Sequence, residues 1–340
     1  MTSLTRVIAL SITLTFVALS AVAHAQSASA KQTPPQGSDG HADLQGVWNF
    51  ASATPLQRPV ELADKAFFTQ EEAAELAAQA GNRRPWDASP PDGSVGAYNQ
   101  FWWDRGLPVA DRRTSLIVDP ANGRVPPLTP QAIRQVGSTE HHVPGRLPVR
   151  YRIGGTGADG PEERGLAARC LVGYNAGPPM LPGGYNNNMQ ILQTPDHVVI
   201  LNEMVHDTRI IQLNPRPPLP EDVELWSGDS RGHWTDDTLV IETTNFSNKR
   251  ASFEPSVVTA LGTGDTLRLI ERFTRIDEHT LLYEFTVDDP QTFTRPFTAS
   301  VPMKRNAEPM FEYACHEGNY GMFNMLTAGR AEDDAQPGAK

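Results

Sequence analysis

The feature that most constrains the fold is a two-residue alternation in the last third of the chain. Over 280–288 every second residue is large and apolar, and the segment 266–276 before it also has a two-residue period. Successive side chains of a β-strand point to opposite faces of a sheet, so this pattern predicts consecutive antiparallel strands with one buried face. The apolar positions of the later segment are Leu281, Tyr283, Phe285 and Val287.

The rest of the C-terminal half carries the same kind of pattern. β-branched and aromatic residues gather in short runs separated by turn residues, which indicates strands. We expect strands over 189–193, 197–213, 238–246, 266–276, 280–288 and 297–305, with hairpin turns over 234–238 and 276–280. The predicted fold class is mainly β, an antiparallel meander closed into a barrel, with long ordered loops and one short N-terminal helix.

The single expected helix covers 69–80. Thr69 followed three residues later by Glu72 is a capping box, and Gly81 ends the helix. Residues 82–185 are rich in Pro, Gly and Arg and are interpreted as long loops that wrap the core. The aromatic residues over 98–103, Trp103 among them, favour an ordered loop region.

The N-terminus has the three parts of a secretory signal. Arg6 precedes an apolar run over 7–22, and Ala23-His24-Ala25 is a small-x-small cleavage site. A membrane anchor is less favoured, because the run is shorter than the roughly 20 residues that span a bilayer. We therefore expect a signal peptide over 1–25, a disordered lead-in over 26–40, one domain over 41–330, a disordered tail over 331–340, and a periplasmic or secreted location.

The net charge limits the possible classes of binding partner, and the number of cysteines limits the possible cross-links. The net charge is −11, which opposes nucleic-acid binding, and no second segment is apolar enough to insert in a membrane. The two cysteines, Cys170 and Cys315, are most simply one disulfide in an oxidising compartment. A Cys/His metal site is the alternative, although no CxxC or HxxxH spacing supports it.

Two resemblances follow from short motifs. Gly46-Val47-Trp48 at the expected first strand resembles the GxW that opens lipocalin and other calycin barrels, where the Trp closes one end. A longer set of motifs resembles a family of secreted bacterial proteins known as hypothetical proteins, which implies export and a common fold but no activity. Those motifs are RCL at 169–171, YNNN at 185–188, EMVHDTR at 203–209, GDSRGHW at 228–234, DTLVIETTNF at 237–246 and EYACHEGNYGM at 312–322.

The segment 203–209 is the first candidate site. If the strand continues through it, Glu203 and Arg209 share one face while His206 lies on the other. Such a density of titratable groups is costly to bury unless they are paired. One hypothesis is a polar cluster in the barrel mouth with His206 as acid or base, and the other is a surface salt-bridge ladder.

The second candidate segment is 312–320. His316 and Glu317 lie beside Cys315, which fits either a catalytic cluster or a turn pinned by a disulfide. Three consecutive asparagines could bind a carbonyl or sugar hydroxyls, although turn formation explains them equally well. The candidate substrate-binding residues are Asn186, Asn187, Asn188, Tyr320 and Trp103.

Several further groups have open alternatives. Glu242 and Glu271 lie in apolar strands, where they could be acid/base groups or internal partners of Arg268 or Arg272. A loop role is expected for residues 229–233. No cofactor is required, although a metal held by His206 and His316 with nearby carboxylates stays open. For these residues, structural and catalytic roles are both open.

The sequence is consistent with two functional hypotheses. The first is a cofactor-independent lyase, isomerase or hydrolase that acts on a small polar or aromatic substrate by general acid/base catalysis. The second is a calycin-like binding protein that holds an apolar ligand without turning it over. A structural envelope module would instead point these groups outward and apart. The charge inside the barrel separates the first two hypotheses.

Overall fold

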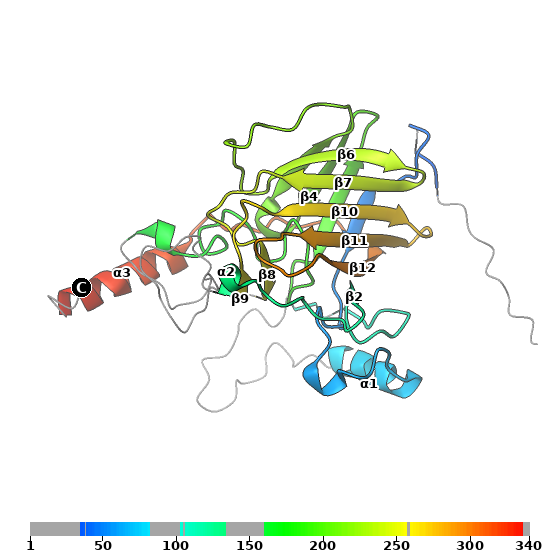
Figure 1. The fold of residues 1–340 in the computed structure, drawn as a ribbon, viewed down its shortest axis with the longest axis horizontal. Coiled ribbons are helices and arrows are strands. Elements are labelled where there is room, and N and C mark those ends of the chain that lie inside the picture. Colours follow the sequence, from blue (N-terminus) through cyan, green and yellow to red (C-terminus); the bar gives the residue numbers. More distant parts are fainter. Residues whose placement is uncertain are drawn as a thin grey trace, which may run out of the picture. The chain divides into compact units, whose positions relative to one another are not determined.

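A closed barrel of nine strands is the central feature of the computed structural model (Figure 1). Residues 35–37, 39–81, 103–104, 106–133, 160–256 and 259–335 are described, and they belong to one compact unit, Thr33–Lys340. The expected signal peptide therefore lies outside the described residues, as do 82–102 and 134–159 of the loop region. Around the barrel the strands are β1 (Gly46–Asn49), β3 (Asn188–Gln193), β4 (His197–Asn202), β5 (Thr208–Gln212), β6 (Asp229–Thr235), β7 (Thr238–Thr244), β10 (Arg268–Arg275), β11 (Thr280–Asp288) and β12 (Phe297–Asn306).

Two pairings complete and extend the barrel. β1 pairs with both β3 and β12, which closes the ring. The short strand β2 (Ile117–Asp119) adds to β12, while β8 (Phe253–Ser256) and β9 (Thr259–Leu261) form a separate two-stranded sheet. The mainly β barrel expected from the sequence is confirmed.

The expectation of an entirely antiparallel meander is wrong at one junction. β5 and β6 run parallel, with Gln212 opposite Arg231. Hairpin turns join only antiparallel neighbours, whereas parallel neighbours need a longer crossover. Residues 213–228 provide that crossover, so the chain returns to the end where β5 began before β6 starts.

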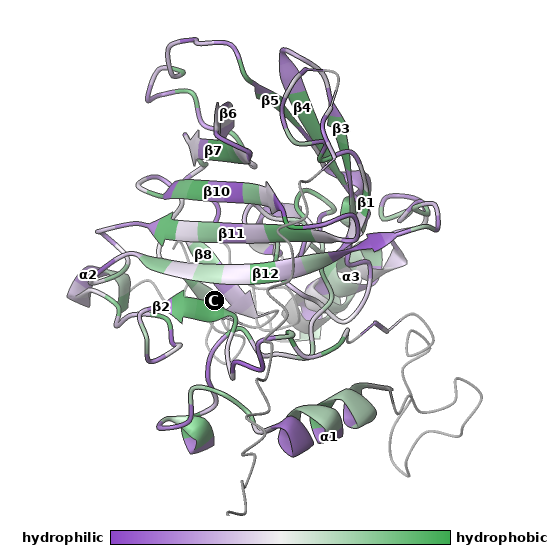
Figure 2. Ribbon diagram, turned by 90° about the vertical axis from the view of Figure 1, so that its right-hand side faces the viewer, coloured by the Kyte–Doolittle hydropathy of each residue, from purple (hydrophilic) through white to green (hydrophobic). Residues whose placement is uncertain are grey.

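The barrel interior follows the period-two pattern. Figure 2 shows hydrophobic and hydrophilic bands alternating along β10 and β11. The inward side chains of β11 are fully buried, and so is the inward carboxylate of Glu271 on β10. Figure 1 shows β6, β7, β10, β11 and β12 side by side in the order given by their pairing.

Trp48 of β1 belongs to the buried core of the barrel. It is fully buried, and its indole Nε1 donates a hydrogen bond to the carbonyl of Leu44 at 2.9 Å. The guanidinium groups of Arg275 and Arg305 lie 5.0 and 5.8 Å from its ring centroid. Arg275 also donates to the carbonyl of Asp43, so the chain before β1 is tied to β10 across the Trp ring.

The helices are few in the described residues. α1 (Gln70–Gly81) has the expected capping box, in which Glu72 N donates to Thr69 Oγ1 at 3.2 Å and Thr69 N donates to Glu72 Oε2 at 2.8 Å. α3 (Tyr320–Ala335) was not expected, and it extends into the range interpreted as a tail. The others are α2 (Pro130–Ile133) and the 3₁₀ turns η1 (Val60–Leu62), η3 (Pro161–Glu163) and η4 (Met204–His206).

The expectation of one continuous strand over 197–213 is wrong. β4 ends at Asn202 and β5 begins at Thr208, with η4 between them. Val205 has φ 61° and ψ 15°, and His206 has φ 44°, so two successive residues leave the extended region. The segment is a tight turn between two antiparallel strands, and the shared faces expected of a continuous strand do not exist.

The loop expected over 229–233 is also wrong, because these residues belong to β6. Gly232 explains how this part of β6 can pair with its neighbouring strand. A Cβ at this position would lie 2.8 Å from the Ile211 side chain, so glycine allows β5 and β6 to approach closely.

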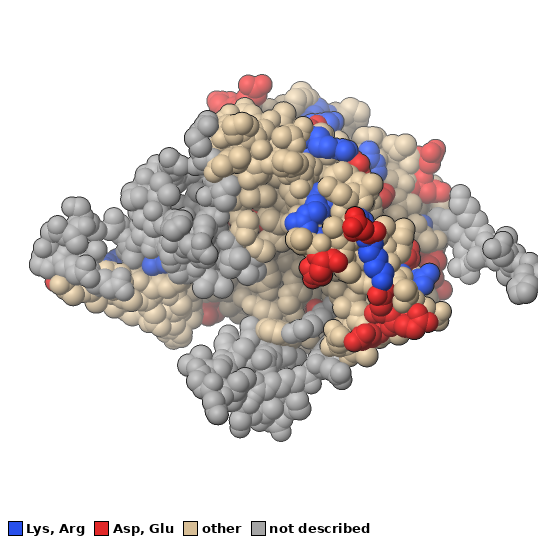
Figure 3. Space-filling model, turned by 60° about the horizontal axis from the view of Figure 1, so that its bottom comes forward, with Lys and Arg blue, Asp and Glu red and all other residues tan. Residues whose placement is uncertain are grey.

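The surface carries both signs of charge. Figure 3 shows, on one face, acidic and basic side chains lying next to one another. Surface ion pairs include Arg268 with Glu242 and Arg295 with Asp119. Across the part of the chain that the structure describes, every helix is too short or too polar to cross a membrane.

Candidate functional site

A pocket of about 370 Å³ lies against the outside of the barrel. Its floor is formed by outward side chains of three neighbouring strands, Val47 of β1, Gln190 of β3 and Leu201 of β4, which are paired in register. The β4–β5 turn supplies one wall and the segment after β12 supplies the other. Asn202 at the end of β4 and the turn residues Glu203 and His206 form the first wall, and the segment residues are Pro309, Met310, Phe311 and Glu312.

Glu203 is held firmly at the start of the turn. Its Oε2 accepts hydrogen bonds from the side-chain Nδ2 of Asn188 at 2.8 Å and from the backbone N of Asn188 at 3.3 Å. Its own backbone N donates to the carbonyl of Asn188 at 2.9 Å. Only 8% of the residue is exposed, so this is a fixed, nearly buried carboxylate.

Asn188 is itself fixed by neighbouring amides. Its Oδ1 accepts from Asn49 Nδ2 at 3.1 Å and from Asn306 Nδ2 at 3.2 Å. The structure places this candidate substrate-binding residue against Glu203, where its amide orients the carboxylate.

A second apolar cluster, separate from the main core, attaches the turn to the C-terminal segment. Met204 and Val205 of the turn pack with Cys170 and Ala176, and Cys315 lies partly buried against them. Cys170 and Cys315 form a disulfide with a Cα–Cα distance of 5.8 Å, which confirms the expected pairing. The cluster and the disulfide therefore hold two distant parts of the chain together.

This attachment brings the two candidate histidines together. The ring centroids of His206 and His316 lie 6.1 Å apart with the rings tilted by 51°, and both residues are exposed. His206 lines the pocket beside Glu203, and Glu312 faces it from the other wall. The result is a set of imidazoles and carboxylates that can bind a polar group and exchange protons with it.

Asn202, the last residue of β4, carries a buried amide next to the pocket. Only 1% of the residue is exposed, and neither its Oδ1 nor its Nδ2 has a hydrogen-bond partner among the described residues. Buried polar groups are nearly always paired, so this amide is suited to an ordered water inside the protein.

Arg209 lies elsewhere, inside the barrel. Its guanidinium makes two hydrogen bonds to the carboxylate of Glu271, at 2.7 and 3.0 Å, and the hydroxyl of Tyr283 donates to the same carboxylate at 2.8 Å. The backbone N of Met180 in turn donates to the Tyr283 hydroxyl at 3.2 Å. Arg209 is thus paired inside the barrel and is not among the residues that line the pocket with Glu203 and His206.

The buried pair shifts the pKa of its members. Burial lowers the pKa of the Arg209 guanidinium, but the charge and hydrogen bonds of Glu271 outweigh this and hold it above its usual value. Burial raises the pKa of the Tyr283 hydroxyl well above 10.0, and the negative charge of Glu271 raises it further. Tyr283 therefore stays a neutral hydrogen-bond donor inside the core.

The other candidate residues have varied surroundings. Asn187 is buried and bonded to Gly183 and to the carbonyl of Asp104, which leaves it no exposed amide for a substrate. Asn186 has φ 54°, which fits the turn interpretation. Outside the pocket lie Glu317 and Tyr320, both exposed, and Trp103, half-buried.

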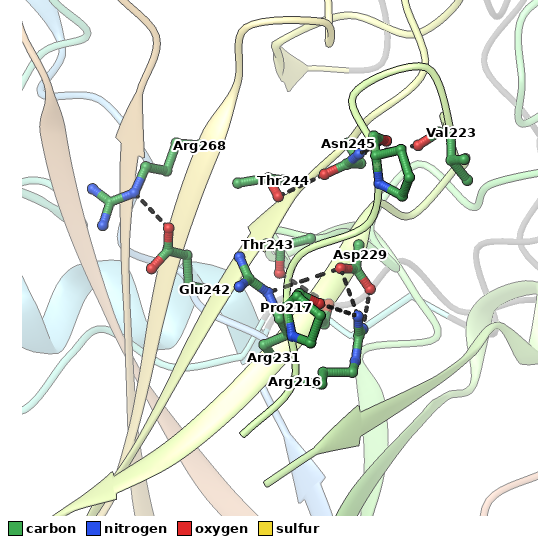
Figure 4. A network of polar contacts seen from close by, with 12 residues as sticks. Arg216, Pro217, Val223, Asp229, Arg231, Glu242, Thr243, Thr244, Asn245 and Arg268 are labelled. Carbon is green, nitrogen blue, oxygen red and sulfur yellow. Dashed lines mark hydrogen bonds and ion pairs between the residues drawn. The ribbon is translucent and has the colours of Figure 1, made fainter. Parts of the chain in front are cut away.

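A polar network on the barrel surface surrounds Asp229. Figure 4 shows Arg216 and Arg231 approaching this carboxylate, and Arg216 Nη1 lies 3.2 Å from Asp229 Oδ2. Glu242 accepts a hydrogen bond from Arg268 at 2.8 Å, which lowers the pKa of the carboxyl. Glu242 thus pairs with Arg268, but on the outer face and not inside the barrel as expected, whereas Glu271 pairs with Arg209.

A metal at the histidines was the remaining alternative. Within the described residues, no group of three or more His, Cys, Asp or Glu side chains is arranged to hold a metal ion.

Several pocket residues were not singled out from the sequence. Outward residues of a barrel normally face solvent, so Val47 and Leu201 became a pocket floor only because residues 309–312 cover them. Glu312 is the first residue of the candidate segment 312–320, which is rich in acidic and basic groups. Comparison of the chain with models of known families, with curated proteins and with solved structures finds no match.

Proposed function

We propose that this protein converts a small molecule by general acid/base catalysis in the pocket, with His206 as the group that transfers the proton. The observation that carries the proposal is the convergence of His206 and Glu203 from the turn with Glu312 from the C-terminal segment around one cavity. Imidazole gains and loses a proton near neutral pH, which makes His the most common general acid or base. The reaction class is that of a lyase, isomerase or hydrolase that needs no cofactor.

The roles follow from burial. Glu203 is fixed by Asn188 and suits orientation of a bound polar group, whereas the exposed imidazole of His206 can exchange protons with both substrate and solvent. His316, whose ring centroid is 6.1 Å from that of His206, suits a second proton acceptor. The apolar floor of Val47 and Leu201 would hold the body of the substrate.

The backbone of the turn supports a functional role. A β-branched residue rarely adopts positive φ, yet Val205 does so at φ 61° and is followed by His206 at φ 44°. Strained residues gather at functional sites, where the surrounding structure holds them in place. Here the apolar cluster around Met204 and Val205 provides that support and fixes the direction of His206.

The filled barrel argues against the carrier hypothesis. An apolar-ligand carrier needs a hollow interior, and a side chain that lines a water-sized void retains some accessible surface. Most inward residues of the described strands have none, and the fully buried set includes Ile191, Ile200, Ile211, Ile241, Phe273, Phe285 and Val301. The charged Arg209–Glu271 pair among them also differs from the apolar lining of a carrier.

Export and a calycin-like origin belong to the same proposal. A disulfide persists in oxidising compartments, and the chain begins with a signal-like segment, so we infer that the protein works in the periplasm or outside the cell. The buried Trp48 of the GxW, packed under Arg275, supports a calycin-like closure of the barrel.

Turnover of an untargeted mixture tests the function. The protein is incubated with a broad extract of small metabolites, and consumed compounds are identified by mass spectrometry. His206→Asn is the matched variant, because Asn tolerates positive φ and cannot transfer protons at neutral pH. His279→Asn, at an exposed turn, is the control. Wild type and the control should consume the same compound while His206→Asn does not; consumption by all three, or by none, contradicts the proposal.

A further inference from the structure

The pocket lining has a one-sided chemistry. Its charged members are the carboxylates of Glu203 and Glu312, and none of the described lining residues is Lys or Arg. The remaining surface is largely apolar, from the barrel floor to Met310 and Phe311. Anionic walls over an apolar floor favour a ligand that is cationic at one end and apolar at the other.

Glu203 is the strongest of these features. It is only 8% exposed, its Oε2 is bonded to Asn188, and no cation pairs with it among the described residues. An ionised carboxylate is costly to bury without a positive partner, so a cation entering the pocket would gain a favourable interaction that water cannot supply fully. An anion entering the same space would be repelled by both carboxylates.

The nearby arginines are already engaged. Arg209 follows the turn, but both of its terminal nitrogens bond to Glu271 inside the barrel. Arg305 follows on β12, but its guanidinium lies over the Trp48 ring. Neither arginine therefore neutralises Glu203, so within the described residues the counter-charge is left for a bound molecule to supply.

Phe311 provides a second attraction for a cation. The residue is 71% exposed although it lines the pocket, so its ring is available to a ligand. Ammonium groups are attracted to the face of an aromatic ring within about 6 Å. The volume of about 370 Å³ is at the small end of ligand pockets and suits a compact molecule.

We infer that the pocket binds a primary or secondary ammonium ion carried on a compact apolar or aromatic body. The ammonium group lies between Glu203 and Glu312, and the apolar body rests on Val47 and Leu201 beneath Phe311. This inference names the substrate class of the proposed reaction and rests on the proposed function for its catalytic meaning, but binding itself needs no turnover.

Three probes of similar shape and different charge test the inference. Benzylammonium, benzyl alcohol and benzoate are titrated into the full protein at about pH 8, where free imidazole is mostly neutral, with the methyl resonance of Met310 as the local NMR reporter. Benzylammonium should bind at least about tenfold more tightly than benzyl alcohol, because a charge-assisted contact is added. Benzoate should bind more weakly than both. Equal affinity for the three, tightest binding of benzoate, or no binding of benzylammonium overturns the inference.

Variants that replace a carboxylate with a neutral amide test which carboxylate binds the ammonium group. Glu203→Gln should weaken benzylammonium by about tenfold and change benzyl alcohol by less than about twofold. Glu312→Gln, at an exposed position that tolerates substitution, should weaken benzylammonium in the same direction and keeps the test open if Glu203→Gln does not fold. Glu278→Gln is the matched control, because it removes one exposed carboxylate outside the pocket. An equal effect of all three variants would mean that only the net charge matters and would overturn the site.

The two proposals fail separately. Benzylammonium binding that depends on Glu203, together with unchanged turnover in His206→Asn, would leave the ligand class standing and refute the catalytic role. Turnover that depends on His206, together with no preference for the ammonium probe, would refute the ligand class alone.

Discussion

The imidazole rings of His206 and His316 lie with their centroids 6.1 Å apart, at a junction held from two sides. Val205, which precedes His206, packs in the same apolar cluster as Cys170, and Cys315, which precedes His316, is bonded to Cys170. The disulfide therefore serves the candidate site more directly than it serves the barrel, because neither cysteine lies in a barrel strand.

Removal of the disulfide should destabilise the folded protein while the barrel still forms. The bridge joins residues 145 positions apart, and a Cys170→Ser/Cys315→Ser variant should lose about 2–4 kcal/mol of unfolding free energy. Denaturant unfolding measures the loss, and far-UV circular dichroism should still report the barrel. In the wild type, denatured and unreduced, thiol titration should find no free thiol. Two free thiols would contradict the bridge.

Truncation of Trp48 should weaken the barrel itself. The residue is fully buried, bonded to Leu44 and covered by Arg275, so Trp48→Ala should cost about 3–5 kcal/mol of unfolding free energy. Trp48→Phe, which keeps an aromatic ring, should cost less. Chemical denaturation provides the comparison, and a loss below about 1 kcal/mol for the alanine variant would show that Trp48 does not close the barrel.

The buried ion pair should show strong coupling. Arg209→Met leaves the carboxylate of Glu271 buried without its cation and should cost about 3–5 kcal/mol. The double variant Arg209→Met/Glu271→Leu removes both charges and should be more stable than Arg209→Met alone, as measured by a double-mutant cycle of unfolding free energies. Strictly additive effects would mean that the two side chains do not interact in solution.

Tyr283 gives the protein an alkaline limit. Its folded pKa is raised well above 10.0 by burial and by Glu271, so the neutral hydroxyl is favoured in the folded state. The corresponding stability is complete below the unfolded pKa of about 10 and is lost as the pH rises towards the folded pKa. Unfolding free energies should thus fall above about pH 10, and less steeply in Tyr283→Phe. Identical slopes in the two proteins would contradict this origin.

Much of the barrel could be predicted because its inward faces carry a local signal. The alternation over 280–288 matched β11 at both ends, and the start of β7 at Thr238 was also expected. The parallel pairing of β5 with β6 had no such signal, since it depends on where a long crossover returns the chain. β6 was missed because charged residues and Gly232 hid its alternation.

The candidate site was predictable only in part, for a related reason. His206, His316 and Glu203 were chosen from residue type, and the structure brings them to one region. The break at Val205 was invisible, because valine favours strands and only tertiary packing forces it to positive φ. The partner of Arg209 lies 62 residues away on another strand, and sequence spacing does not specify such pairs.

The most direct test of the catalytic role of His206 is chemical rescue on the compound that the wild type consumes. Gly accepts the left-handed backbone at this position, so His206→Gly should fold while losing only the imidazole. We predict that kcat/KM falls by about 10²–10⁴ in this variant, as expected for loss of a general acid or base. Added imidazole should restore part of the activity of His206→Gly and leave the wild type unchanged. A variant with wild-type kcat/KM, or an inactive folded variant that imidazole does not rescue, would contradict His206 as the proton-transferring group.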